Sequence, residues 1–266
     1  EFEFQDTEDQ ANVTSELLFD LNSGLPMDRL ICGDVGFGKT EVALRGAFNV
    51  AMSGAQVAFI VPTTLLCSQH YENFTKRFKN FPLKVDQISR LNSTSENNKI
   101  IERINSGESD VVVGTHALLN SKIKFKKLGM LIIDEEQHFG VSQKEKIKSL
   151  RSNVHVLALT ATPIPRTLQM SLVGLRDLSI ISTAPLNRQN INTEVIDFND
   201  EKIISAIEYE LSRNGQVYYV CPRINELKEV EDFLKSKLPN VKYQIAHGQM
   251  PSKNLKNTMI DFYNNE

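Results

Sequence analysis

The segment 33–40 (GDVGFGKT) has the residue types and spacing of a loop that binds phosphate groups. It fits the pattern G-x-x-x-x-G-K-[ST], in which glycines let consecutive backbone N–H groups turn towards phosphate oxygens. Lys39 would bridge the β- and γ-phosphates of a nucleoside triphosphate, and Thr40 would bind Mg²⁺. The competing interpretation is a glycine-rich structural turn. The nucleotide-binding residues predicted from this loop are Gly33, Asp34, Val35, Gly36, Phe37, Gly38, Lys39 and Thr40.

Three consecutive acids follow an apolar run in LIIDEEQHFGV (131–141). Magnesium bound to a nucleotide needs a second hard oxygen ligand at the end of a neighbouring strand, and Asp134 has such a position. Glu135 could then orient and deprotonate the water that attacks the γ-phosphate. Alone, this pattern is more typical of a strand that ends in a solvated acidic turn. Its combination with the phosphate loop favours the magnesium site and leaves Glu136 without a chemical role.

Short strands alternating with helices are the elements that must position these residues. Nearly continuous runs of Val, Ile and Leu predict strands that are buried on both faces. The alternation predicts an α/β fold, a doubly wound parallel sheet flanked by helices with right-handed crossovers. The expected strands are 29–34, 56–62, 84–89, 110–115, 129–135 and 154–160, and a helix is expected at 40–54.

A polar stretch at 182–195 interrupts this alternation and is a candidate linker. Two further strands are then expected, at 215–222 and 242–248, with helices at 223–238 and 252–264. Two such units are too few for a complete sheet, and the chain begins without Met, so we expect a piece of a longer protein. The predicted organisation is a first lobe at 1–185, a linker at 186–195 and a truncated second lobe at 196–266.

The composition is ordinary for a globular protein, with 41% apolar and 24% charged residues and a net charge of −3. A balance this close to neutral does not exclude nucleic acid, because a local groove can still be basic. The three cysteines, Cys32, Cys67 and Cys221, are far apart and predict reduced thiols in the cytoplasm. No apolar run has the length of a membrane span, so no membrane partner is expected.

Two further motifs resemble those of superfamily 2 helicases and translocases. TATP (160–163) is similar to their motif III, which couples the nucleotide site to nucleic acid, and this resemblance assigns coupling to Thr160 and Thr162. FQDTEDQ (4–10) is similar to the Q-motif region, in which Gln10 would read the adenine edge. The order of such motifs along the chain is more specific than any one of them.

Longer segments resemble the family of bacterial transcription-repair coupling factors over nearly all of the chain. They are MDRLICGDVGFGKTEVALR (27–45), FKKLGMLIIDEEQHFGV (125–141), LTATPIPRTLQMSLVGLRDLSII (159–181) and HGQM (247–250). The branched-DNA helicase RecG is the nearest relative and shares TATP and PIPRTL. RecG usually has Ser at the position of Phe37, which favours the coupling factors.

This resemblance implies two RecA-like lobes, of which the first binds ATP and Mg²⁺ and the second is only begun. The whole protein would use ATP to move along double-stranded DNA behind stalled RNA polymerase, displace it and recruit excision-repair proteins. The regions that bind polymerase and repair proteins would lie outside this chain, which is expected to be monomeric. The spacing of the residues by itself indicates only a magnesium-dependent nucleoside triphosphatase.

One departure from the family concerns the residues after the acids, where family members usually have His and Arg. This chain has Gln137 and His138. Gln at the first of these positions is common across superfamily 2, so Gln137 is expected to link the γ-phosphate site to the TATP segment through its amide. His138 would replace a fixed charge by a titratable group, or would simply be an exposed residue in a turn.

The resemblance of PTTLLCSQHY (62–71) to motif Ia and of GTHALL (114–119) to motif Ib implies contacts with the nucleic-acid backbone at strand ends. The same residue types also cap helices. Arg166 could equally face DNA or pack inside the protein, and HGQM could be a structural turn. The lysine run KIKFKK (122–127) is more typical of a solvated turn. The predicted DNA-binding residues are Thr63, Thr64, Gln69, Thr115, His116, Arg166, His247 and Gln249.

Two other functions remain open at this point, a branched-DNA helicase like RecG and a scaffold that binds nucleotide without hydrolysing it. In the family, the second lobe also supplies an arginine finger from motif VI, and no such segment follows Glu266. An arginine finger accelerates related triphosphatases by about 10³–10⁵. The chain by itself is therefore expected to bind ATP weakly and to hydrolyse it poorly.

Overall fold

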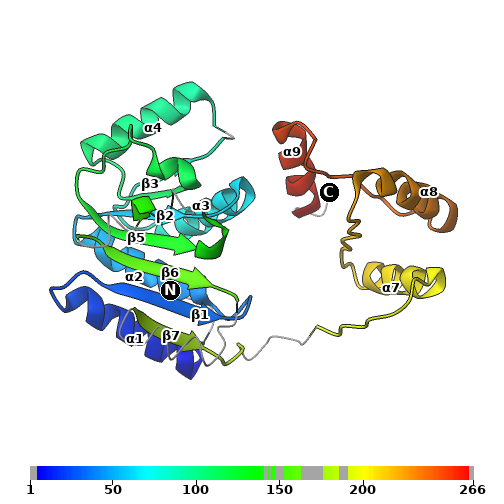
Figure 1. Ribbon diagram of the computed structural model, residues 1–266, viewed down its shortest axis with the longest axis horizontal. Coiled ribbons are helices and arrows are strands. Elements are labelled where there is room, and N and C mark those ends of the chain that lie inside the picture. The colour runs from blue at the N-terminus through cyan, green and yellow to red at the C-terminus, as the bar shows by residue number, and fades with distance from the viewer. Residues whose placement is uncertain are drawn as a thin grey trace. The chain divides into compact units, whose positions relative to one another are not determined.

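The computed structural model describes residues 5–90, 92–140, 143, 145–147, 153–162, 176–185 and 191–263 of the protein. The chain divides into two compact units, Glu1–Gln189 and Asn190–Glu266. The first contains a β-sheet covered by helices, and the second contains helices joined by extended segments (Figure 1). No helix among the described residues combines the length and the apolar character that crossing a membrane requires.

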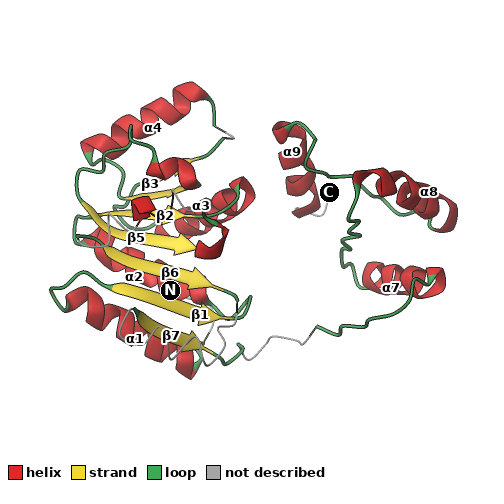
Figure 2. Ribbon diagram, in the orientation of Figure 1, coloured by secondary structure: helices red, strands yellow, loops and turns green. Residues whose placement is uncertain are grey.

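A parallel sheet of seven strands forms the centre of the first unit (Figure 2). Its order is β3-β4-β2-β5-β6-β1-β7, and each neighbouring pair runs parallel. Strand β1, which precedes the phosphate loop, is thus separated from the acid-bearing strand β5 by β6 alone. The predicted α/β fold is confirmed. The strands are β1 (Asp28–Gly33), β2 (Gln56–Ile60), β3 (Val85–Ile88), β4 (Val111–Gly114), β5 (Leu128–Asp134), β6 (His155–Thr160) and β7 (Asp177–Ile181).

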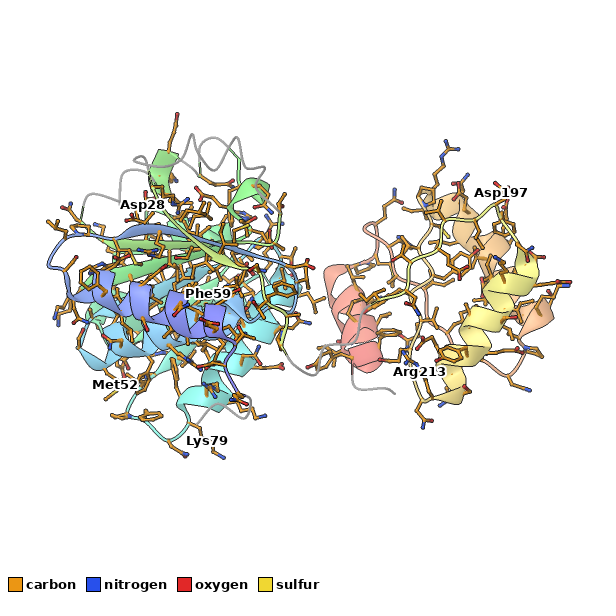
Figure 3. The ribbon with its side chains drawn as sticks, turned by 90° about the horizontal axis from the view of Figure 1, so that it is seen from below. Asp28, Met52, Phe59, Lys79, Asp197 and Arg213 are labelled. Atoms are coloured by element: carbon orange, nitrogen blue, oxygen red, sulfur yellow. The ribbon has the colours of Figure 1, made fainter. Side chains whose placement is uncertain are left out.

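Helices cover both faces of the sheet, and successive residues of a strand point to opposite faces. Phe59 and Ile132 pack with α1, α2 and α3 on one face, whereas Ile60 and Ile133 pack with α4 on the other. Figure 3 shows Phe59 among the side chains of the first unit. Each such side chain stabilises the fold by about 1.5–3 kcal/mol. The helices are α1 (Glu8–Asn22), α2 (Lys39–Met52), α3 (Thr64–Phe78) and α4 (Thr94–Ser106), with the short 3₁₀ helices η1 (His116–Leu119) and η2 (Glu136–His138).

The helix α1 and the strand β7, neither of which was predicted, lie side by side at one edge of the sheet (Figure 1). Arg29 of β1 joins them. Its Nε pairs with Asp20 of α1 at 2.6 Å, and its Nη1 contacts Glu16 of α1 at 3.0 Å. The same Nη1 donates to Ser179 of β7 at 2.7 Å. This nearly buried guanidinium fixes α1 against the strand that leads into the phosphate loop.

Asp86 of β3 is a buried carboxylate that makes stability depend on pH. Burial raises its pKa, but hydrogen bonds donated by Arg103 and Ser109 outweigh burial, and the net pKa lies below the usual value of 3.8. A carboxylate with a lowered folded pKa contributes stability above its unfolded pKa and loses it as the pH falls through the folded value.

We therefore expect Asp86→Asn to lower the free energy of unfolding by about 1.5–3 kcal/mol at pH 7, the range for hydrogen bonds to charged groups. The difference from the wild type should begin to shrink below about pH 4, where the unfolded wild type takes up a proton, and should disappear at lower pH as the folded state is also protonated. Urea unfolding at pH 7, 5 and 3.5 measures this. A difference that is the same at all three values would contradict the assignment.

Cys67 of α3 is a buried thiol whose reactivity is correspondingly low. Burial raises its pKa to about 11, and a hydrogen bond from Gln87 offsets only part of this. Because only the thiolate attacks disulfide reagents, we expect Cys67 to react far more slowly than Cys221, which is partly exposed. Timed labelling of the native protein at pH 8, followed by peptide mass spectrometry, measures the two rates. Equal rates would show that α3 opens readily.

The second unit contains the helices α7 (Asp200–Ser212), α8 (Leu227–Lys237) and α9 (Ser252–Tyr263), and the 3₁₀ helix η3 (Ile224–Glu226). The predicted strands at 215–222 and 242–248 were wrong, because neither segment belongs to a sheet. Their residues do alternate between partly buried and exposed, as in a strand, and Val220 is 83% exposed. The alternation predicted an extended backbone, but a strand exists only where a neighbour supplies hydrogen bonds.

Candidate nucleotide site

The residues predicted to do chemistry meet at one edge of the sheet, where the parallel strands have their carboxyl ends. The phosphate loop follows β1, Ala161 and Thr162 follow β6, and Glu135 follows β5. Since β6 lies between β1 and β5, the TATP segment lies between the phosphate loop and the acids. Open α/β sheets bind their ligands at this edge.

The phosphate loop has a backbone that only glycine adopts easily. Gly36 and Gly38 have φ values of 81° and 83°. Gly38 precedes the first residue of α2, and a Cβ at this position would collide with Nε2 of Gln10. A Cβ on Gly33 would lie 2.9 Å from the carbonyl oxygen of Ile181. The glycines of the motif thus serve both the turn of the loop and its close packing against α1 and β7.

Lys39 is held by the loop that it follows. Its Nζ donates to the carbonyl oxygens of Gly33, at 2.5 Å, and Asp34, at 3.0 Å. Burial lowers the pKa of Lys39, although the charges of Glu135 and Asp134 act in the opposite direction. The ammonium group is therefore partly withdrawn from water and close to both acids. Such a group gains more from a phosphate anion than a fully solvated lysine would.

Gln10 packs against the phosphate loop from α1. Its side chain is buried, its Nε2 donates to the carbonyl oxygen of Phe37 at 2.9 Å, and its Oε1 accepts the N–H of Thr7 at 2.9 Å. Thr7 in turn accepts the N–H of Gln10, which completes a capping box at the start of α1. The T-x-x-Q spacing was a signal for α1 that the apolar patterns did not provide. The reading of adenine by Gln10 stays a prediction.

The two acids have different environments. Asp134 ends β5 with a side chain only 14% exposed, and its Oδ2 lies 3.3 Å from Nε2 of His70. Glu135 has a left-handed backbone with φ 50°, which is uncommon for a residue other than glycine. Its Oε1 accepts the N–H of Ala161 at 3.1 Å. The turn thus directs Glu135 towards β6, whereas Asp134 is directed towards α3.

Gln137 connects the acids to the TATP segment. Its Nε2 donates to Glu135 and, over a longer distance of 3.4 Å, to the hydroxyl of Thr162. Its Oε1 accepts the hydroxyl of Thr160, also at 3.4 Å. The N–H of Thr162 is bound by the Thr160 hydroxyl at 3.2 Å, which closes the network. The predicted coupling residues Thr160 and Thr162 are therefore linked to the predicted base through Gln137, and their role in coupling remains a prediction.

Glu136, which had no role in the sequence analysis, is part of an ion-pair cluster. Nη1 of Arg176, just before β7, donates to Glu136 at 2.9 Å, and Nε of Arg176 lies 2.7 Å from Asp28 at the start of β1. Arg176 is only 11% exposed. Glu136 therefore holds the turn after β5 through its ion pair with Arg176, a role that only the tertiary structure reveals. The side chain of His138 lies outside the described part of the chain.

The predicted DNA contacts of the first unit occupy the same edge of the sheet, after β2 and β4. Thr63 is exposed and caps α3 through the N–H of Leu66, Thr64 is the first residue of α3, and Gln69 is partly buried. Thr115 is buried and caps η1, so its hydroxyl serves the fold. The exposed neighbour His116 is the residue of this loop that could reach DNA.

The other DNA candidates lie in other parts of the chain. The lysine run at 122–127 precedes β5 and so lies at the opposite edge of the sheet, which supports its interpretation as a solvated turn. Arg166 lies outside the described residues. His247 is partly buried and Gln249 exposed in a turn of the second unit.

The residues at the edge fit a magnesium–nucleotide complex. No group of three or more His, Cys, Asp or Glu able to hold a metal occurs among the described residues. Mg²⁺ in such sites needs only one or two protein oxygens, since phosphate and water provide the others. Asp134 and Thr40 offer a carboxylate and a hydroxyl, and the loop with its positive-φ glycines offers N–H groups for phosphate.

Comparison with known proteins agrees with this geometry. The model of the DEAD/DEAH box helicase family matches residues 7–171. Transcription-repair-coupling factors of Rickettsia bellii and Staphylococcus haemolyticus are each 50% identical over 266 residues. These matches cover 98% and 100% of this chain but 24% and 23% of those proteins, so the chain spans about a quarter of their length.

A solved structure of RecG bound to a three-way DNA junction is 31% identical, with a TM-score of 0.77. The match covers 98% of this chain and 35% of that one. The predicted resemblance to the coupling factors and to RecG is confirmed. The chain belongs to the DEAD/DEAH box helicase family, and it resembles the transcription-repair-coupling factors along its whole length.

Proposed function

We propose that this chain is the ATP-hydrolysing part of a motor that moves along double-stranded DNA in transcription-coupled repair. The observation that supports it best is the contact chain at the carboxyl edge of the sheet, from Glu135 through Gln137 to Thr160 and Thr162. A base that activates water is thus linked to a segment on the neighbouring strand, as a motor that converts hydrolysis into movement requires.

The residues divide the chemistry among them. N–H groups of the phosphate loop and the start of α2 bind the phosphates, and Lys39 leaves the carbonyls of Gly33 and Asp34 for the β- and γ-phosphates. Glu135 takes a proton from the attacking water while Ala161 holds its other oxygen. Bound Mg²⁺, held by Thr40 and Asp134, would neutralise charge that develops on the phosphates.

The proposed partner is double-stranded DNA, which Thr63, Thr64, Gln69 and His116 would contact through its phosphates. These residues follow β2 and β4, beside the nucleotide residues that follow β5, β6 and β1. In the whole protein, which we place in the cytoplasm, other regions would contact stalled RNA polymerase and excision-repair proteins. The identity of 50% to transcription-repair-coupling factors supports this part of the proposal.

The test is binding of nucleotide by the chain, with Lys39→Ala as the comparison. We expect a fluorescent ATP analogue to bind the wild type in the presence of Mg²⁺ and to bind Lys39→Ala at least about tenfold more weakly, since a hydrogen bond to a charged group contributes about 1.5–3 kcal/mol. Equal affinity of the two proteins would refute a phosphate role for this loop.

A branched-DNA helicase is a second candidate, favoured by the structural similarity to RecG bound to a three-way junction. The higher identity to the coupling factors supports the first proposal. The two differ in the DNA that stimulates hydrolysis by the parent protein. A linear duplex should stimulate a translocase as well as a three-way junction of equal length, whereas a branched-DNA helicase should prefer the junction.

A further inference from the structure

His70 of α3 is a buried polar residue that the proposed chemistry does not use. It lies on the apolar face of α3 with Cys67, Phe74 and Phe78, and it is 6% exposed. Its ring packs against the ring of Phe59, with the centroids 4.7 Å apart and the planes tilted by 38°. A position of this kind normally holds an apolar side chain, because burying an imidazole removes its nitrogens from water.

Of the two ring nitrogens of His70, Nε2 has a polar partner among the described residues. Its Nε2 lies 3.3 Å from Oδ2 of Asp134. Taken without the backbone, the side chain of His70 is 8% exposed and that of Asp134 is 14% exposed. Its Nδ1 is buried, and no described residue provides it with a hydrogen-bond partner. The contact with Asp134 is therefore the interaction that offsets the cost of burying this imidazole.

We propose that His70 is a positioning residue, which donates from Nε2 to Oδ2 of Asp134 and so directs Oδ1 towards the magnesium of the bound nucleotide. This inference rests on the proposed function. A carboxylate at a strand end can rotate about its side-chain bonds, and a donor on one oxygen selects one orientation. The other oxygen keeps its lone pairs for the metal.

The packing around His70 makes the donor rigid. The rings of Phe59 in β2 and Phe74 in α3 lie 5.3 Å apart, and the ring of His70 packs against Phe59. A partner that orients a metal ligand typically changes metal affinity by about 10–100-fold. The same helix begins at Thr64, a predicted DNA contact, so α3 connects the DNA side of the edge with the metal ligand.

The chain offers matched variants for a test. His70→Leu keeps apolar packing and removes the donor, whereas His70→Gln restores an N–H at about the reach of Nε2. Phe74→Leu disturbs the same helix face without any polar contact to Asp134. If His70→Leu does not fold, His70→Asn takes its place, because its amide is too short to reach Asp134.

Affinity for a fluorescent, non-hydrolysable ATP analogue is measured by titration of each folded variant, with Mg²⁺ and with EDTA. We expect His70→Leu to weaken binding at least about tenfold with Mg²⁺ and to leave binding in EDTA unchanged. His70→Gln should recover most of the magnesium-dependent affinity, and Phe74→Leu should match the wild type in both conditions.

The outcomes separate the two proposals. A wild type that binds no nucleotide in either condition refutes the proposed function and this inference with it. If the wild type binds the ATP analogue more tightly with Mg²⁺ than with EDTA, and His70→Leu binds it as the wild type does, the positioning role alone is overturned. The positioning role is also overturned if His70→Leu loses the same affinity with Mg²⁺ and with EDTA, or if Phe74→Leu loses as much affinity as His70→Leu. Either result would assign His70 to packing.

Discussion

Replacing Glu135 by Gln in the parent protein is expected to reduce ATP hydrolysis by about 10²–10⁴, the usual contribution of a general base. The amide keeps an oxygen that can accept the N–H of Ala161, so the turn after β5 should persist. What disappears is the ability to take a proton from the attacking water. Nucleotide affinity should stay close to that of the wild type, since the phosphate loop is not changed.

The neighbouring acid provides a matched control for this experiment. Glu136→Gln removes the same charge one residue away, but Glu136 faces Arg176 and not the site of hydrolysis. We expect normal hydrolysis and a modest loss of stability. Single-turnover hydrolysis of labelled ATP, with protein in excess, detects even a slow rate. If Glu135→Gln hydrolyses ATP as fast as Glu136→Gln, another group is the base.

Gly38→Ala is expected to impair nucleotide binding. The residue has φ 83°, and the new Cβ would meet Nε2 of Gln10. Relief of this collision must move the amide of Gln10, which breaks its hydrogen bond to the carbonyl oxygen of Phe37, or move the loop itself. Either change alters the support of the loop N–H groups that would bind phosphate. Loss of one hydrogen bond to phosphate costs about 1.5–3 kcal/mol, which corresponds to roughly 10–100-fold in affinity.

Gly54→Ala separates backbone strain from collision. Gly54 has φ 78°, close to that of Gly38, but nothing lies within 4 Å of its added Cβ. Both variants should lose stability, on the order of 1–3 kcal/mol for a residue forced into this conformation. Only Gly38→Ala should lose nucleotide affinity. The measurements are thermal unfolding and titration with the ATP analogue, and equal affinities would show that the loop tolerates the collision.

The six predicted strands of the first unit lie within one or two residues of their observed positions. All but the edge strand β3, which has the mixed sequence VDQI, are apolar runs buried on both faces. Burial on both faces produces continuous runs of Val, Ile and Leu, which a single sequence displays directly. The strand β7, DLSII, has one exposed apolar residue, Ile180, at the edge of the sheet, and its mixed pattern gave no such signal. The helix α1 was missed for a related reason, since its apolar face is narrow.

The site residues show the same division. The glycines, Lys39, Thr40, Asp134 and Glu135 form contiguous motifs, and a motif displays its residues at fixed spacing. His70 and Arg176 act through contacts with residues far away in the chain, 64 positions from Asp134 in the first case and 40 from Glu136 in the second. A lone His on an apolar helix face, in LLCSQHY, was the one available sign of the first.

The sequence by itself determined the α/β class, the position of the phosphate loop and the pair of acids, because these depend on local patterns that burial and phosphate binding impose. The tertiary structure alone decided that β6 lies between the loop and the acids. It also decided that Gln137 meets Thr160 and Thr162, that Glu136 belongs to Arg176, and that His70 contacts Asp134. Strand order and side-chain contacts across the sheet depend on how distant segments pack together, and no spacing within one segment specifies that.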